Sequence, residues 1–272
     1  MKRMTLLGIL LGIYFVYNIA VLGVWAGTAS VSIYPPIYAF VMGPVIWMIA
    51  VVTTGLTTYV AYKFLPKEEP RVTSKPATAA NGGTVTVGMG RRIAAVTSRE
   101  AGLIAAFSGI TFAWNALGLI IVIFPPGSWS ITGIMPQIVG MGTGPIGLFI
   151  AHFVGGLLWY DFPWGTFNFM LSSTLLITIA YPFYYNVAKV YKYPILFMQT
   201  FLLHQYDVFS WALWASNFAQ LAHPSFVVPS TIVFIGPWSL LNAVPIVIIV
   251  ALLDRYAPGF LRPTWLERYT TK

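Results

Sequence analysis

Residues 131–160 read ITGIMPQIVGMGTGPIGLFIAHFVGGLLWY, an uncharged apolar stretch that Gly144 and Pro145 interrupt. A helix crosses the ~30 Å hydrocarbon core of a bilayer in about 20 residues, and a proline inside a helix removes a hydrogen bond and kinks the chain. If this stretch crosses a membrane once, Lys189 and Lys192 lie opposite the basic residues that precede it. If it breaks at Gly144 and crosses as two short pieces, or if one piece is re-entrant, both lysines return to the basic side. We expect the broken form, although pieces of about fifteen residues are short for a bilayer.

The composition places the whole chain in a membrane. Of its 272 residues, 58% are apolar and 8% are charged, and the mean hydropathy is +0.77, whereas a soluble domain has roughly 25% charged residues. Soluble enzymes, nucleic-acid-binding proteins, disordered tails and secreted disulfide scaffolds are therefore excluded. The chain has no cysteine and three histidines, which excludes thiolate metal sites and iron–sulfur clusters.

Apolar segments of about one span recur along the chain, which predicts an all-α, polytopic transmembrane helical bundle. With the broken segment we expect eight membrane segments and cytoplasmic termini, whereas a single crossing would give seven. Small residues at 27–29 resemble a signal cleavage site, but the first apolar stretch exceeds the ~7–15 residues of a signal peptide core, so we expect a retained anchor. The segments are 4–26, a second one that ends near residue 63, 101–124, 131–160, 166–187, 195–222 and 228–253.

The basic residues are unevenly distributed. The chain has 15 Lys and Arg against 7 Asp and Glu, a net charge of +8, and nine of the 15 lie at the N-terminus, at Lys63 or in the hydrophilic stretch 64–100. The positive-inside rule makes this side cytoplasmic in a multi-pass protein of the cell membrane. We therefore expect an N-terminal transmembrane hairpin (1–63), a basic cytoplasmic linker (64–100) and a main transmembrane bundle with a short cytoplasmic tail (101–272).

The first two spans echo the segments after the linker at a constant offset of 101 residues. A duplicated hairpin would explain this pattern, since many transporters contain internal repeats. Parallel selection for small residues and proline in membrane helices would explain it equally well. The matched positions are Gly8 and Gly109, Gly12 and Ala113, Pro35 and Pro136, Gly43-Pro44 and Gly144-Pro145, Gly55-Leu56 and Gly156-Leu157, and Tyr59 and Tyr160.

Small residues form a stripe on one face of the segment that follows the linker. Ala105, Gly109 and Ala113 recur every fourth residue, and a helix face without bulky side chains lets another helix approach closely. The partner helix belongs either to this chain, as in ordinary internal packing, or to another protein that docks here.

Ionisable side chains near the middle of apolar segments are candidate functional residues, because a charge in hydrocarbon is costly. Asp207 lies in segment 195–222, one helical turn after His204, so the two can form an intramembrane polar pair. This pair is either structural or functional. His152 also falls near mid-membrane, and two histidines on different helices can ligate a haem. The alternative for His152 is a hydrogen-bonded interior histidine.

Amide and indole side chains within the apolar segments are candidate ligand-binding groups. Aromatic walls with a few amides suit a planar ligand that is uncharged or weakly charged. The alternative is an aromatic belt at the lipid headgroups combined with hydrogen bonds between helices. The candidates are Asn168, Trp214, Asn217, Asn115 and Asn242.

From residue 97 to 258 the chain resembles the substrate-binding S-component of an energy-coupling-factor vitamin importer. The similar motifs are Ser98-Arg99-Glu100-Ala101 running into the Ala105, Gly109 and Ala113 stripe, Gly144-Pro145-Ile146-Gly147 followed by Gly155-Gly156 and Asp161, and Gly236-Pro237 followed by Asn242-Ala243. The family has six spans, and the N-terminal hairpin and the basic linker of this chain are additional to that pattern.

The resemblance implies a non-catalytic subunit that binds a small vitamin-like molecule. Asn168, Trp214 and Asn217 would line its pocket, and Ala105, Gly109 and Ala113 would contact a membrane coupling subunit. Separate ATPase subunits would drive uptake, since this chain has no phosphate-binding Walker loop. No cofactor and no nucleic acid are implied.

A second interpretation belongs to another class of protein. The chain would be a membrane subunit of a respiratory or oxidase complex, in which His152 and His204 ligate haem b or Asp207 relays protons. Association with a quinone, or a cofactor-free scaffolding role in such a complex, belongs to the same interpretation.

Overall fold

The computed structural model describes residues 51–52, 54–68, 96–119, 121–124, 127–158, 170, 175–217 and 224–266. Within these ranges, side chains are described except at 122–124, 127, 128, 175, 202, 205–217 and 224–236. Most of the first half of the proposed sequence repeat and most of the linker therefore lie outside the described residues.

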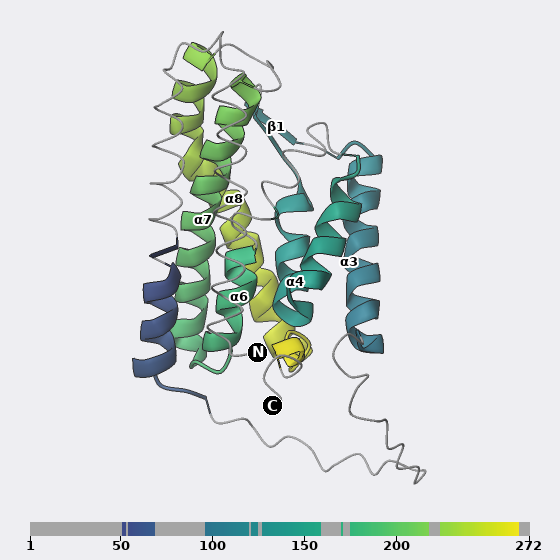
Figure 1. Ribbon diagram of the computed structural model, residues 1–272, viewed down its shortest axis with the longest axis vertical. Coiled ribbons are helices and arrows are strands. Elements are labelled where there is room, and N and C mark those ends of the chain that lie inside the picture. The colour runs from purple at the N-terminus through teal and green to yellow at the C-terminus, as the bar shows by residue number, and fades with distance from the viewer. Residues whose placement is uncertain are drawn as a thin grey trace.

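The described chain is mostly helical, as the sequence predicts. Residues 54–64 form a helix, and the remaining helices run roughly along the long axis of the molecule (Figure 1). A short β-hairpin between α3 and α4 is the described departure from the all-α expectation. The elements are α3 (Ser98–Ala116), β1 (Ile121–Phe124), β2 (Gly127–Trp129), η1 (Ile131–Gly133), α4 (Met135–Gly156), α6 (Leu175–Tyr184), α7 (Lys189–Asn217), α8 (Pro224–Tyr256) and η3 (Thr264–Leu266).

A capping box fixes the start of α3. The Thr97 side chain accepts a hydrogen bond from the Glu100 backbone amide at 3.2 Å, and the Glu100 carboxylate accepts one from the Thr97 amide at 2.9 Å. The first backbone N–H groups of a helix have no partner within the helix, and the capping box pairs two of them here. The helix ends at Ala116, and Gly118 follows with a φ of +65°.

Helix α4 is broken at Gly144, as the sequence predicts. Gly144 has φ +84° and ψ −171°, which no α-helix contains, and Pro145 follows directly. Two observations show that the chain reverses there. Leu148 packs on the α-carbon of Gly140, where an added Cβ would lie 3.0 Å from the Leu148 Cβ. Asn115 donates hydrogen bonds both to Thr132, just before α4, and to the Gly155 carbonyl near its end.

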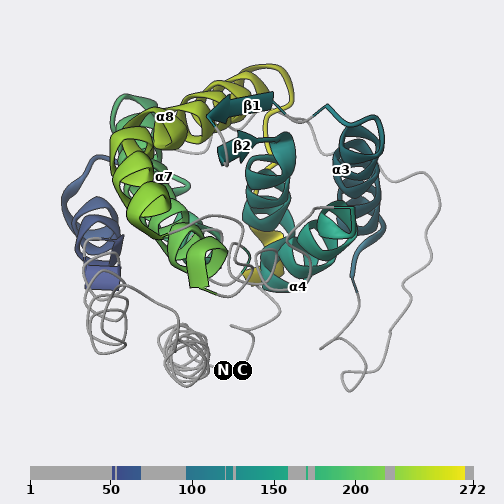
Figure 2. The ribbon, with the colours of Figure 1, turned by 90° about the horizontal axis from the view of Figure 1, so that it is seen from above.

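The two arms of α4 therefore lie antiparallel beside α3. Gly142, close to the turn, lies against Leu103 near the start of α3, whereas Gly155 lies against Thr111 near its end. At about 1.5 Å per residue, each arm extends roughly 14–18 Å, about half of the ~30 Å hydrocarbon core. Figure 2 shows α3 and α4 together on one side of the molecule, with α7 and α8 on the other.

Trp265 stabilises the turn between the arms. The carbonyl of Met141 would normally accept from the amide four residues later, but that residue is Pro145, which has no N–H. The Trp265 indole Nε1 donates to the Met141 carbonyl instead, at 3.3 Å. A Cβ at Gly144 would lie 2.6 Å from the same indole ring, so the ring occupies the space that any larger residue would need.

Two stretches of described helix are long and apolar enough to cross a membrane, Ile131–Gly156 and Pro237–Tyr256. The first stretch meets this criterion by its length and composition, which take no account of the break at Gly144. Because it turns back at Gly144, it enters and leaves at the same end of the bundle and is not a single crossing.

The described Lys and Arg residues lie at or next to the ends of elements that meet at one end of the bundle, the lower end in Figure 1. Several contacts connect them there. The Lys192 ammonium pairs with Asp254, Arg99 donates to the Gly259 carbonyl at 2.7 Å, and Lys67 forms an antiparallel bridge with Val187. These residues are Lys63, Lys67, Arg99, Lys189, Lys192, Arg255 and Arg262.

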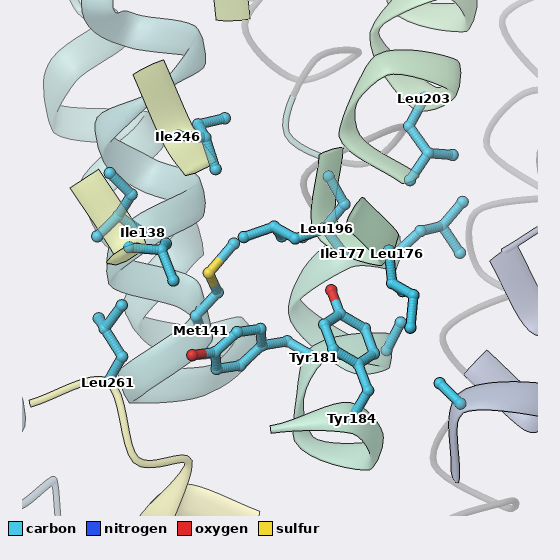
Figure 3. Close-up of a cluster of buried hydrophobic side chains, with 14 of the residues drawn as sticks. Ile138, Met141, Leu176, Ile177, Tyr181, Tyr184, Leu196, Leu203, Ile246 and Leu261 are labelled. Carbon is cyan, nitrogen blue, oxygen red and sulfur yellow. The ribbon is translucent and has the colours of Figure 1, made fainter. Parts of the chain in front are cut away.

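The main core lies between α4, α6, α7 and α8 (Figure 3). Tyr181 and Tyr184 form an aromatic contact in it, with ring centroids 5.5 Å apart in an edge-to-face arrangement. The helix at 54–64 joins the same core through Ala61, and Gln199 on α7 donates to its Thr58 at 2.9 Å. The residues labelled in the figure are Ile138, Met141, Leu176, Ile177, Tyr181, Tyr184, Leu196, Leu203, Ile246 and Leu261.

We predict that Trp265→Phe destabilises the protein by about 1–3 kcal/mol, because the Met141 carbonyl loses its donor while the ring still fills the turn. The apparent melting temperature of the purified protein in detergent measures this effect. Trp114→Phe is the matched control, since the described residues offer no partner to the buried Nε1 of Trp114. Equal losses in the two variants would contradict the assigned role of the indole N–H.

Candidate functional site

Uncharged polar side chains occupy the interior toward the end of the bundle opposite the basic residues. One group surrounds Asn115, whose amide donates to Thr132 Oγ1 at 2.9 Å and to the Gly155 carbonyl at 2.6 Å, and accepts from Ser130 at 3.2 Å. Both N–H groups are thereby used. Asn115 thus ties α3 to both arms of α4, and we assign it a structural role rather than the ligand contact that the sequence suggested.

The β-hairpin reaches this interior through Trp129. Its indole Nε1 donates to the Asn242 side-chain oxygen on α8 at 3.2 Å, and the Asn242 amide donates to the Trp238 carbonyl at 3.3 Å. Asn242 is buried, and its amide retains one N–H and an acceptor position beyond these two bonds. Of the two described amides among the candidates, Asn242 is therefore the one whose hydrogen-bonding capacity is not exhausted by these bonds.

A buried hydrogen bond joins the first arm of α4 to α7. The Gln137 amide nitrogen donates to the Gly133 carbonyl at 3.0 Å and lies 2.5 Å from His204 Nε2. The carbonyl requires a donor, which fixes the orientation of the Gln137 amide. His204 then accepts at Nε2 and, as a neutral ring, carries its proton on Nδ1. Gln137 is fully buried and His204 is 1% exposed.

His152 and Thr178 extend this polar group deeper into the bundle. His152, on the second arm of α4, is 1% exposed. Thr178 of α6 lies directly against Gly140, one turn after Gln137. Among the described residues, no hydrogen-bond partner is present for His152 Nδ1, Thr178 Oγ1 or Gln137 Oε1. Buried polar atoms without partners are rare and costly, particularly in a membrane, so these atoms mark a candidate binding region.

The predicted pair of His204 and Asp207 stays a prediction, and among the described side chains His204 contacts Gln137. The Asp207 side chain lies outside the described residues, as do those of Trp214 and Asn217 and the whole of Asn168. Gln137, Trp129 and Thr178 were not singled out from the sequence. A glutamine inside an apolar span was the signal that could have identified Gln137.

Chemically, the described region offers neutral donors and acceptors beside an indole. No group of three or more His, Asp and Glu able to hold a metal ion occurs among the residues that the structure describes. For the haem interpretation, His204 would have to break its bond to Gln137 if it ligated iron through Nε2. The haem ligands remain a prediction.

The small-residue stripe faces away from the part of the protein that the structure describes. Ala105, Gly109 and Ala113 are exposed on α3, whereas Leu103, Ser108 and Asn115 are buried against α4. A Cβ added at Gly109 would meet no described atom within 4 Å. Packing within the described part of the chain therefore does not use the stripe.

The basic end holds a buried ion pair rather than a second polar pocket. Lys192 of α7 pairs with Asp254 of α8, Tyr193 donates to the same carboxylate at 3.3 Å, and the Lys192 ammonium lies 4.8 Å from the centre of the Tyr185 ring. The ammonium and carboxylate compensate each other, and the aromatic ring further stabilises the cation. We assign this group to the packing of α7 on α8.

No protein-family model, no curated protein and no solved structure matches this chain significantly.

We predict that Asn115→Leu lowers the stability of the ligand-free protein by about 1–3 kcal/mol, because the Gly155 carbonyl and Thr132 lose their donor in the interior. The apparent melting temperature in detergent checks this effect. Ala116→Leu, at the neighbouring exposed position, should leave it unchanged. A stable Asn115→Leu protein would contradict the structural role.

Proposed function

We propose that this chain is the substrate-binding membrane subunit of an importer for a small, vitamin-like molecule, driven by separate ATPase subunits through a membrane coupling subunit. The observation that carries the proposal is the division of α3 into two faces. One face is buried against α4 through Asn115, and the other presents Ala105, Gly109 and Ala113 outward. An outward stripe of small residues suits a helix of another membrane protein, because backbones can approach closely there.

The same proposal gives the chain several membrane crossings with its basic end in the cytoplasm. The clustering of the described Lys and Arg at one end supports this orientation. Between α3 and α8, the described helical segments are α3, two arms of α4, α6, α7 and α8. Their number equals the six spans of the S-components that the sequence resembles, with the two α4 arms as half-length segments that turn back at Gly144. With the N-terminal hairpin, the total is the eight segments expected from the sequence.

We place the ligand in the half of the bundle remote from the basic end. Trp129 and Asn242 provide an indole beside an amide, and Gln137 with His204 provides a second polar pair. Neutral groups of this kind orient a small heterocyclic ligand by hydrogen bonds while the surrounding apolar side chains exclude water. Asn168, Trp214 and Asn217 complete the pocket in this proposal.

The second candidate function is a membrane subunit of a respiratory or oxidase complex. One observation favours it: His152 on the second arm of α4 and His204 on α7 are both buried. Haem b would require both imidazoles as axial ligands.

Native purification followed by mass spectrometry separates the two functions. We expect ATPase and coupling subunits to co-purify, together with a small organic molecule. A porphyrin, a reduced-haem absorption band and cytochrome subunits would overturn the importer proposal in favour of the second function.

We predict that Gly109→Leu abolishes co-purification of the coupling and ATPase subunits while the small molecule stays bound, because leucine prevents close approach on the outer face of α3. Gly55→Leu is the matched control, since Gly55 is also exposed and has no described atom within 4 Å of an added Cβ. Retention of the partner subunits by Gly109→Leu would refute docking on this face.

A further inference from the structure

The residues that follow α8 form a strap beneath the turn of the broken helix. We define the strap as Gly259–Leu266. Gly259 has φ +85°, and the Arg262 amide donates back to the Gly259 carbonyl at 3.1 Å, which turns the chain sharply. Trp265 is 1% exposed and Leu261 is 2% exposed, so the strap is packed into the protein rather than lying on its surface.

The strap covers the turn from the basic end. A Cβ added at Gly142 would lie 3.5 Å from the Phe260 carbonyl oxygen and 3.7 Å from Leu261 Cα. On the other side of the turn, the Trp265 ring fills the space beside Gly144 and its N–H binds the Met141 carbonyl. The strap therefore contacts the turn on both sides of Gly144.

Helix α3 holds the other end of the strap. The Arg99 guanidinium donates to the carbonyls of both Gly259 and Phe260, and the Phe107 ring lies 6.5 Å from that of Phe260. Arg99 is exposed, so the link consists of hydrogen bonds at the protein surface rather than a buried salt bridge. Arg99 lies nearly two turns before Ala105, the first residue of the small-residue stripe, on the same helix.

We propose that the strap is an inner gate, and that α3 controls it through Arg99. A partner that binds the outer face of α3 and shifts the helix would withdraw the guanidinium from the two carbonyls. Release of the strap would remove Trp265 from the turn and expose the inner ends of both α4 arms to the cytoplasm. The role of this gate in uptake rests on the proposed function, whereas the mechanical link from Arg99 to the turn does not.

Cysteine labelling of the full chain tests the link, because the natural sequence contains no cysteine. Gly142→Cys places a thiol under the strap, where the added Cβ has ordinary contacts. Lys189→Cys places a thiol at an exposed position at the same end. The probe is a charged methanethiosulfonate applied to membrane vesicles whose basic end faces outward.

We expect Arg99→Gln to accelerate labelling of the Gly142→Cys thiol by roughly tenfold, because both carbonyls of the strap lose a charged donor. Labelling of Lys189→Cys should not change, and Arg99→Lys should restore part of the protection. An unchanged rate at position 142 would overturn the proposal. Equal acceleration at both positions would also overturn it, because it would indicate general loosening rather than release of the strap.

This experiment requires neither the ligand nor the partner subunits. The strap can therefore fail the test while the importer proposal stands. Conversely, a respiratory complex found by mass spectrometry would remove the importer proposal and leave the labelling result intact.

Discussion

One backbone carbonyl, that of Met141, governs the turn on which this fold depends. Pro145 cannot donate to the Met141 carbonyl, and a buried carbonyl without a donor is costly in a membrane. Trp265 supplies the missing N–H at 3.3 Å, from a position 124 residues later in the chain. The inner turn of α4 and the C-terminal strap must therefore lie at the same end of the bundle. Gly144 permits the arrangement because its φ of +84° and its lack of a side chain leave room for the indole.

The reversal of α4 separates two chemical environments. Helix α4 enters and leaves at the end of the bundle where α3 finishes. As a result, α6 and α8 both finish at the opposite end, where α3 and α7 begin and where the described basic residues lie. The opposite half contains Asn115, Gln137, His204 and Asn242, all buried and none formally charged. Charge at one end suits an orientation in the membrane, and neutral donors and acceptors in the other half suit recognition of a ligand.

The sequence predicted those features that depend on local chemistry. Gly144-Pro145 indicated the break in α4. The distribution of basic residues indicated that the chain turns back there, so that Lys189 and Lys192 return to the basic side. The four-residue spacing of Ala105, Gly109 and Ala113 indicated a helix face without bulky side chains. Contacts between distant residues could not be predicted in this way. Gln137 and His204 are separated by 67 residues, and periodicity does not state which helices are neighbours. For the same reason Asn115 was indistinguishable from a ligand-binding amide, although its bonds to Thr132 and Gly155 are internal. The β-hairpin was missed because its apolar strand continues the hydrophobic pattern of α3.

The reversal at Gly144 is the feature on which the fold depends most, and the sidedness of single cysteines tests it directly. Cysteines placed at Lys67, Lys189 and Arg262 should react with an impermeant maleimide from the cytoplasmic side of the membrane, and cysteines at Gly118 and Leu157 from the opposite side. If α4 crossed the membrane once instead, Lys189 and Arg262 would react from the side opposite to Lys67, and the fold described here would be contradicted.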